Sequence, residues 1–183
     1  MPAGGRHGRQ AGWGYHRLAD DWAQRLVAAA GVRAGDLVLD VGAGTGALTA
    51  PLVGAGARVV AFELHAGRAD ALRRRFAGAP VTVVRADGAD LRLPRRPFRV
   101  VANPPFGITT GLIRRLLSPG SRLTTADLVV PSHVARRWIG PRAPGMNRWS
   151  CTFVAHSSGR IPRGAFHPPA PGTAVVLRVE RGA

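Results

Sequence analysis

The residues with the clearest chemical potential are four consecutive ones, Asn103-Pro104-Pro105-Phe106. Two consecutive prolines exclude a helix or a central strand and hold the backbone in an extended turn. The turn aims two acceptors, the Asn103 side-chain oxygen and the Pro104 carbonyl, at one point, and two acceptors match the two hydrogens of a planar amino group. Phe106 offers an aromatic face on which a base can stack. We predict that Asn103, Pro104 and Phe106 are the catalytic residues.

This arrangement suits chemistry on the amino group of adenine. The lone pair of that nitrogen is delocalised into the ring, so the nitrogen is a poor nucleophile. Two acceptors that hold its hydrogens draw it toward tetrahedral geometry and stabilise the charge that develops in the transition state. A base inside a duplex cannot reach such a turn, so we expect an unpaired or flipped-out target.

A glycine-rich segment upstream predicts a cofactor site. Glycines at 42, 44 and 46 allow a sharp turn and a close approach of a ligand to the main chain. The spacing also satisfies the dinucleotide pattern, but Asp40 would repel a pyrophosphate and attract the ammonium group of S-adenosylmethionine. Hydride transfer also has no use for the asparagine–diproline turn. We therefore predict S-adenosylmethionine, bound by Asp40, Gly42, Gly44 and Gly46.

Acidic residues further along the chain complete this predicted site. Glu63 stands about 20 residues after the glycines, where a ribose-binding acid belongs. Asp87 follows the next strand and can accept a hydrogen bond from an adenine amino group, whereas we interpret Asp90 as the cap of a turn. We assign Leu64 and Gly88, the neighbours of these acids, to the same site, and we expect Asn103 to contact the cofactor as well.

Short apolar runs alternate with helical patterns around these residues. A helix is predicted over 17–30, and further helices near 46–55, 66–77, 109–117 and 132–139 separate the strands Leu37–Val41, Val59–Phe62, Val81–Val84, Phe98–Ala102 and Leu128–Val130. This alternation indicates a parallel sheet covered by helices on both faces. Ser150–His156 and Ala174–Glu180 are predicted to form an antiparallel pair at one edge. Ligands bind outside the carboxyl ends of such strands, where the motifs would meet.

Composition limits the class of protein. The 183 residues suit one domain, no apolar run approaches the ~20 residues that span a bilayer, and one cysteine excludes a disulfide scaffold. The 26 basic residues, all arginine, outnumber 10 acidic ones and give a net charge of +16. Such an excess predicts a polyanionic partner, and nucleic acid suits arginine better than a membrane surface does.

Taken together, the motifs resemble the Erm and KsgA family of adenine dimethyltransferases that act on ribosomal RNA, from about Trp13 to Glu180. The segment Gly14–Leu18 stands where the family has a Gln-Asn-Phe-Leu-like opening, so the resemblance implies cofactor contacts for Tyr15 and His16. Phe166–Pro171 resembles the Phe-x-Pro-Pro-x-Val stretch that closes the catalytic domain.

The resemblance implies an α/β fold: a seven-stranded, Rossmann-like class I S-adenosylmethionine-dependent methyltransferase, mostly parallel with an antiparallel edge pair. It implies methylation of the 6-amino group of an adenine in 23S ribosomal RNA, as in the Erm branch, with resistance to macrolides, lincosamides and streptogramin B.

Departures from the family pattern keep alternatives open. Tyr15 and Arg17 replace the family's Gln and Phe, and Pro104 replaces its more usual Ile or Leu. Proline at this place also occurs in DNA adenine and protein glutamine methyltransferases, which remain alternative functions. A catalytically silent RNA-binding or assembly factor on the same scaffold is an alternative of another class.

We expect no C-terminal helical domain of the kind that is typical of the family. We expect residues 1–12 to be a disordered basic tail and 13–183 to be a single catalytic domain, monomeric and cytoplasmic. RNA binding would then fall on the catalytic domain and its tail. The candidate contacts are Arg73, Arg74, Arg75, Arg95, Arg96, Arg114, Arg115, Arg136 and Arg137.

Other conspicuous residues are given structural roles. The six histidines lack the spacing of metal ligands, so no metal is expected. Cys151 is predicted to be a small buried side chain in a strand. Trp138 and Trp149 are interpreted as packing residues rather than base-stacking ones.

Overall fold

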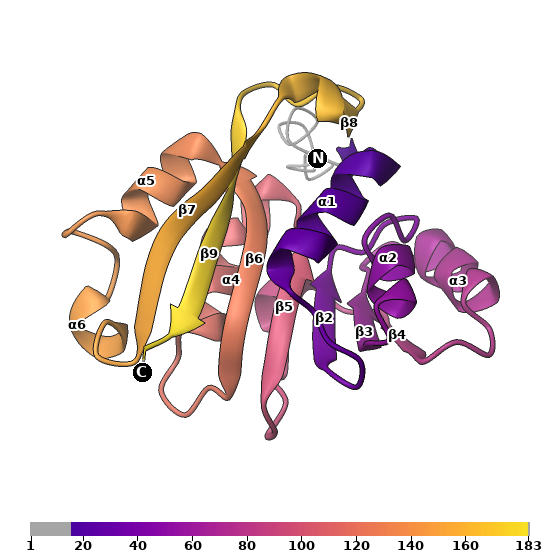
Figure 1. Ribbon diagram of the computed structural model, residues 1–183, viewed down its shortest axis with the longest axis horizontal. Helices are drawn as coiled ribbons and strands as arrows, with labels where there is room; N and C mark the ends of the chain where they lie inside the picture. Colours follow the sequence, from indigo (N-terminus) through magenta and orange to yellow (C-terminus); the bar gives the residue numbers. More distant parts are fainter. Residues whose placement is uncertain (1–15, 183) are drawn as a thin grey trace, which may run out of the picture.

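The computed structural model describes residues 16–182 and shows a seven-stranded sheet in the order β4-β3-β2-β5-β6-β9-β7 between two layers of helices (Figure 1). The five strands from β4 to β6 are parallel, and β9 pairs antiparallel with both β6 and β7. The predicted fold class is confirmed, including the antiparallel pair at one edge. The strands of this sheet are β2 (Leu37–Val41), β3 (Arg58–Phe62), β4 (Val81–Val84), β5 (Phe98–Ala102), β6 (Leu123–Pro131), β7 (Phe153–Ile161) and β9 (Ala174–Arg181).

Helices cover both faces because the buried strands alternate apolar side chains between them. In β5, for example, Val100 belongs to the core cluster that also contains residues of α4, α5 and α6, while Val101 belongs to the cluster with α1 and α2. On the same side as α1 and α2, α3 packs its Leu72 against Ala61 of β3. The helices are α1 (Asp20–Ala30), α2 (Thr49–Gly54), α3 (Ala66–Arg75), α4 (Thr109–Leu116), α5 (Ser132–Ile139) and α6 (Met146–Trp149).

Short elements differ most from the sequence-based expectations. The helix expected over 17–30 begins at Asp20, because Arg17–Leu18 forms strand β1, which pairs with β8 (Phe166–His167). The strand expected at Leu128–Val130 is the end of the longer β6, which pairs along its length with β9. Long-range pairing partners, which local patterns do not reveal, set these boundaries.

The two tryptophans are packing residues, as predicted. Trp138 and Trp149 are buried, with ring centroids 6.3 Å apart. The prediction for Cys151 is wrong: this residue is exposed in a turn after α6, because β7 begins only at Phe153.

The carboxyl ends of the parallel strands meet at the upper edge of the sheet in Figure 1. The loops that follow β2, β3, β4 and β5 all begin at this edge, and they carry most of the predicted catalytic and cofactor-binding residues. The expected basic tail, residues 1–12, lies outside the described part of the chain. Within that part, no helix combines the length and apolar character needed to cross a membrane.

Candidate active site

A cavity of about 600 Å³ lies at the carboxyl ends of β2 to β5 and brings most of the predicted catalytic and cofactor-binding residues together. Tyr15 lies outside the described residues. Among the predicted residues, those that line the cavity are His16, Asp40, Gly42, Glu63, Leu64, Asp87, Gly88, Asn103, Pro104 and Phe106. The cavity size falls in the range of about 300–1,000 Å³ that small-molecule sites occupy.

The glycine loop touches the diproline turn at Gly42. The backbone of Gly42 has φ of 77°, and a Cβ placed there would lie 2.7 Å from Cδ of Pro105 and 3.4 Å from Cα of Pro104. A side chain at this position would force the two segments apart. Glycine is therefore required both for its backbone conformation and for this contact. The contact joins the predicted cofactor loop directly to the predicted catalytic turn.

Gly44 and Gly46 shape the loop and do not belong to the lining of the cavity. The Gly44 amide donates a hydrogen bond of 2.9 Å to Oε2 of Glu63. A Cβ on Gly46 would lie 2.7 Å from the ring of Phe76, so this glycine allows the loop to pack against α3. The structure thus places one of the three glycines at the cavity wall and the other two behind it.

Asp40 is a buried carboxyl group at the cavity wall. Thr49 Oγ1 donates a 2.7 Å hydrogen bond to its Oδ2, while Oδ1 has no hydrogen-bond partner among the described residues. The pKa of Asp40 is raised to about 7, chiefly by burial; the hydrogen bond from Thr49 opposes this rise, and the nearby charge of Glu63 adds to it. A buried acceptor without a partner beside a cavity is suited to a cationic group of a ligand.

Glu63 is held by donors on both of its oxygens. Besides Gly44, the His65 amide donates to Oε1 at 2.8 Å and Arg68 Nη2 donates to the same atom at 2.9 Å. Arg68, which was not among the predicted residues, also lines the cavity. Its position one turn into the helix that follows the acid is the signal that could have identified it.

Asp87 both lines the cavity and caps the short 3₁₀ helix η1 (Gly88–Asp90). Its Oδ1 accepts a 2.9 Å hydrogen bond from the Ala89 amide. The interpretation of Asp90 as the turn cap is therefore wrong; Asp87 takes that part. Gly88 allows close packing, since a Cβ there would lie 2.6 Å from Ile108.

Two apolar side chains, Leu64 and Ile108, form part of the cavity wall. Leu64 is 60% exposed. Ile108 lies in η2 (Phe106–Ile108) and was not among the predicted residues. An exposed leucine beside a cavity is suited to contact a planar ring.

His16 packs against the diproline turn. Its main-chain oxygen accepts a 2.8 Å hydrogen bond from Nδ2 of Asn103, and its ring stacks on that of Phe106 with centroids 6.1 Å apart and an interplanar angle of 26°. Its Nδ1 forms a 2.9 Å hydrogen bond with the main-chain oxygen of Pro168. His16 thus connects the N-terminal segment, the turn and the Phe166–Pro171 stretch.

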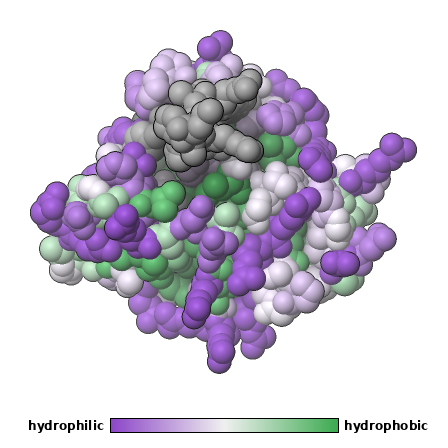
Figure 2. Space-filling view, turned by 180° about the vertical axis from the view of Figure 1, so that it is seen from behind, coloured by the Kyte–Doolittle hydropathy of each residue, from purple (hydrophilic) through white to green (hydrophobic). Residues whose placement is uncertain are grey.

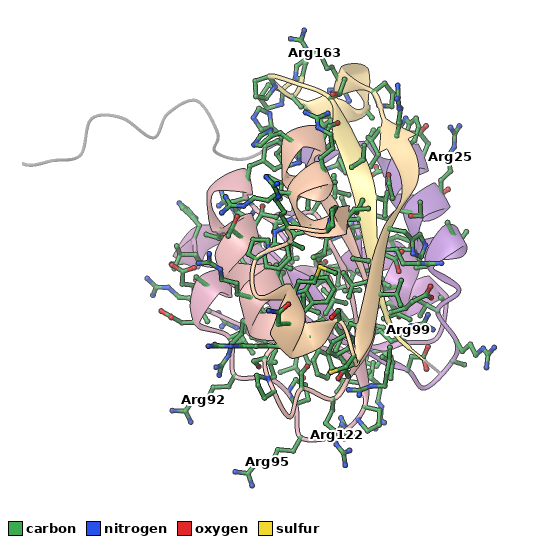
Figure 3. All side chains as sticks on the ribbon, turned by 90° about the vertical axis from the view of Figure 1, so that its left-hand side faces the viewer. Arg25, Arg92, Arg95, Arg99, Arg122 and Arg163 are labelled. Carbon is green, nitrogen blue, oxygen red and sulfur yellow. The ribbon has the colours of Figure 1, made fainter. Side chains whose placement is uncertain are left out.

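The predicted arginine clusters do not share one surface. In Figure 3, Arg95 projects at the same end of the molecule as Arg92 and Arg122, opposite Arg163. Arg95 and Arg96 precede β5, so they lie at the amino end of the strand whose carboxyl end carries Asn103. The structure therefore does not bring them to the cavity.

The other clusters are exposed, but some members are engaged within the protein. Arg75 donates to the main-chain oxygen of Thr45 in the glycine loop, Arg115 donates to that of Leu91, and Arg73 pairs with Asp70. Figure 2 looks onto the face that carries α4 and shows hydrophilic side chains around a hydrophobic strip. The remaining members of these clusters are exposed: Arg74, Arg114, Arg136 and Arg137.

No group of three or more potential metal ligands occurs among residues 16–182.

Similar proteins give the family. A model of the ribosomal RNA adenine dimethylase family matches residues 18–158. An rRNA adenine N-6-methyltransferase of Corynebacterium diphtheriae is 38% identical over 72% of this chain and 52% of its own length. An rRNA methyltransferase of Streptomyces thermotolerans is 39% identical over 86% of this chain and 54% of its own. The chain spans about half the length of these two curated relatives.

A solved structure supports the same grouping. The 23S rRNA methyltransferase ErmE superposes with a TM-score of 0.79 and 28% identity, over 91% of this chain and 70% of its own. Relatives also include a Ribosomal RNA small subunit methyltransferase A of a Synechococcus species, 39% identical over 92% of this chain and 68% of its own. The chain therefore belongs to the ribosomal RNA adenine dimethylase family and has the fold of class I S-adenosylmethionine-dependent methyltransferases.

Proposed function

We propose that this protein transfers a methyl group from S-adenosylmethionine to the 6-amino group of an unpaired adenine in ribosomal RNA. The observation that carries the proposal is the contact between Gly42 and the prolines that follow Asn103, which is so close that a Cβ on Gly42 would lie 2.7 Å from Cδ of Pro105. A cofactor on the glycine loop would lie directly beside two acceptors suited to an aromatic amine.

The cavity fits this cofactor. Asp40, with its unpartnered Oδ1, would hold the ammonium group, and Glu63 would hold the ribose hydroxyls. Asp87 would accept a hydrogen bond from the cofactor's adenine, whose faces would contact Leu64 and Ile108. The bound cofactor supplies a methyl group on a positively charged sulfur, so no side-chain nucleophile is required.

The turn acts on the target amine. Asn103 Nδ2 donates its hydrogen bond to the His16 main-chain oxygen, so Oδ1 remains to accept a hydrogen bond from the target amino group. The Pro104 carbonyl accepts a second hydrogen bond from the same amino group, and the ring of Phe106 stacks on the base. These contacts favour tetrahedral nitrogen and orient it for in-line attack, after which the methylated nitrogen loses a proton to water.

For the target we propose an adenine of 23S ribosomal RNA and, with it, resistance to macrolides, lincosamides and streptogramin B. The 28% identity to the 23S enzyme ErmE supports this choice. Small-subunit RNA is the second candidate, because relatives named for the small-subunit RNA match a larger share of this chain than the Corynebacterium enzyme does.

One incubation series separates these functions. The purified protein would be given labelled S-adenosylmethionine with naked 23S RNA, 16S RNA, duplex DNA or a release factor. We expect label in 23S RNA, with the position mapped by reverse-transcription stops. Label confined to 16S RNA would correct the target, and label in DNA or protein would replace the proposed function. Cofactor that fails to bind at millimolar concentration in calorimetry would support a silent RNA-binding factor.

A further inference from the structure

A second cavity of about 500 Å³ lies between α5 and the edge strand β7. Arg136 and Arg160 line it from the two sides, together with the hydroxyl residues Ser132, Ser157 and Thr173. No aspartate or glutamate belongs to its described lining. Within residues 16–182, neither arginine side chain has a hydrogen bond or ion pair. The groove therefore carries two uncompensated positive charges.

A β-bulge brings the β7 side chains into this groove. In a regular strand, residues three apart point to opposite faces, yet Ser157 and Arg160 both line the same cavity. The register shifts between Ser157, opposite Leu177, and Gly159, opposite Val176. Because of this extra residue in the edge strand, the side chain of Arg160 lies on the same face of the sheet as that of Ser157.

The groove opens at the same edge of the sheet as the active-site cavity. It follows the carboxyl ends of β6 and β7, as Asn103 follows the carboxyl end of β5. The order β5-β6-β9-β7 separates these ends by three strand spacings, or roughly 15 Å. A single strand of RNA covers that distance in a few nucleotides.

We propose that this groove binds the RNA backbone next to the target adenine, through phosphates held by Arg136 and Arg160. The inference rests on the proposed function and adds a positioning site to it. Guanidinium groups form paired hydrogen bonds with phosphate oxygens, and the hydroxyl groups can add single ones. Ile139, which is 41% exposed in the lining, offers an apolar surface to a sugar or base. Such backbone contacts fix the register of the RNA without reading its sequence.

The experiment compares matched arginine variants with the same ribosomal RNA transcript. Arg136→Gln, Arg160→Gln and the double variant remove charge from the groove. Arg142→Gln is the neighbouring control, because Arg142 is exposed in the turn after α5 and lies outside the lining, and Arg122→Gln is the control at the opposite end of the molecule (Figure 3). Thermal unfolding of each variant, and its affinity for S-adenosylmethionine, would show that the fold and the cofactor site are intact.

RNA affinity is measured by anisotropy of a labelled transcript across a salt series, and turnover is measured separately. For the double variant we expect affinity to fall at least tenfold and the salt slope to decrease by roughly 1.4, about 0.7 for each lost contact with a single strand. KM for RNA should rise while kcat is unchanged, and both controls should resemble the wild type.

The outcomes distinguish this inference from the proposed function. If the double variant binds RNA with the affinity and salt slope of Arg142→Gln, the groove is not the backbone site, whether or not the wild type methylates RNA. If the double variant binds RNA more weakly than the controls but the wild type methylates no RNA, the proposed reaction is wrong and the groove stands.

Discussion

The side-chain nitrogen of Asn103 donates a hydrogen bond to the main-chain oxygen of His16, 2.8 Å away. A main-chain oxygen can only accept, so the amide of Asn103 is held with its nitrogen toward His16. The other polar atom, Oδ1, is thereby kept as an acceptor for a target amine. The N-terminal segment, 87 positions away in the sequence, thus determines the orientation of the proposed catalytic side chain.

Replacing Asn103 should abolish turnover without removing the cofactor. In Asn103→Ala one acceptor for the amine is lost, and we expect kcat to fall by about 10²–10³. Calorimetry should show nearly unchanged affinity for S-adenosylmethionine, because Asp40 and Glu63 remain. A parallel loss of cofactor affinity and rate would contradict the role given to Asn103.

Asn103→Asp tests the orientation of the side chain. The carboxylate keeps an acceptor for the amine but places its second oxygen against the His16 main-chain oxygen, and two acceptors repel. We expect a lower thermal midpoint than in Asn103→Ala, together with low turnover. An Asp variant as stable as the wild type would show that the hydrogen bond to His16 does not orient residue 103.

His16 should act on the target base more than on the cofactor. His16→Ala keeps the main-chain oxygen but removes the ring that stacks on Phe106 and the bond to Pro168. We expect kcat to fall roughly tenfold, which corresponds to about 1.4 kcal/mol in the barrier, with unchanged affinity for S-adenosylmethionine. His133→Ala, on exposed α5 surface, is the control. A selective loss of cofactor affinity would instead support the cofactor contact that the family resemblance implies.

Gly42 can be tested against a glycine with the same backbone strain. Gly42→Ala adds both a positive-φ penalty and a clash with Pro105, whereas Gly35→Ala, at φ of 84° with no atom within 4 Å, adds only the penalty. Each should lose about 1 kcal/mol of stability from the backbone. Only Gly42→Ala should lose more than this, and with it most of the activity. Equal behaviour of the two variants would refute the contact between the loop and the turn.

Asp40 predicts proton release when the cofactor binds. With a pKa of about 7, the carboxyl group is half protonated at pH 7. The ammonium group of the cofactor favours the ionised form, so binding should release about half a proton. Calorimetry in two buffers of different ionisation enthalpy at pH 7 measures this release, and affinity should weaken as the pH falls below 7.

Asp40→Asn provides the control for this titration. It should bind the cofactor more weakly and without proton release. The raised pKa also means that the folded protein loses stability as the pH rises from about 4 to 7, because the unfolded chain ionises first. The Asn variant should lack that loss. Proton release that persists in the variant would assign it to another group.

The sequence by itself determined the parts of the site whose geometry is local. Asn103–Phe106 is a rigid turn wherever it is placed, because two prolines restrict its backbone. The alternation of apolar runs and helical patterns predicted the strand that carries Asp40 and the strand that ends just before Glu63, because period and turn residues act over a few positions. The strand Val81–Val84, for example, was predicted with the bounds that it has in the structure.

Tertiary structure alone decided which distant residues meet. The contact of Gly42 with Pro105 and the hydrogen bond from Asn103 to His16 depend on strand order and packing. The same long-range arrangement placed Arg95 at the end opposite the cavity and inserted the bulge that turns Arg160 into the groove. Local periodicity carries no information about such contacts, because they form only when strands far apart in the chain pair and their ends are brought to one edge.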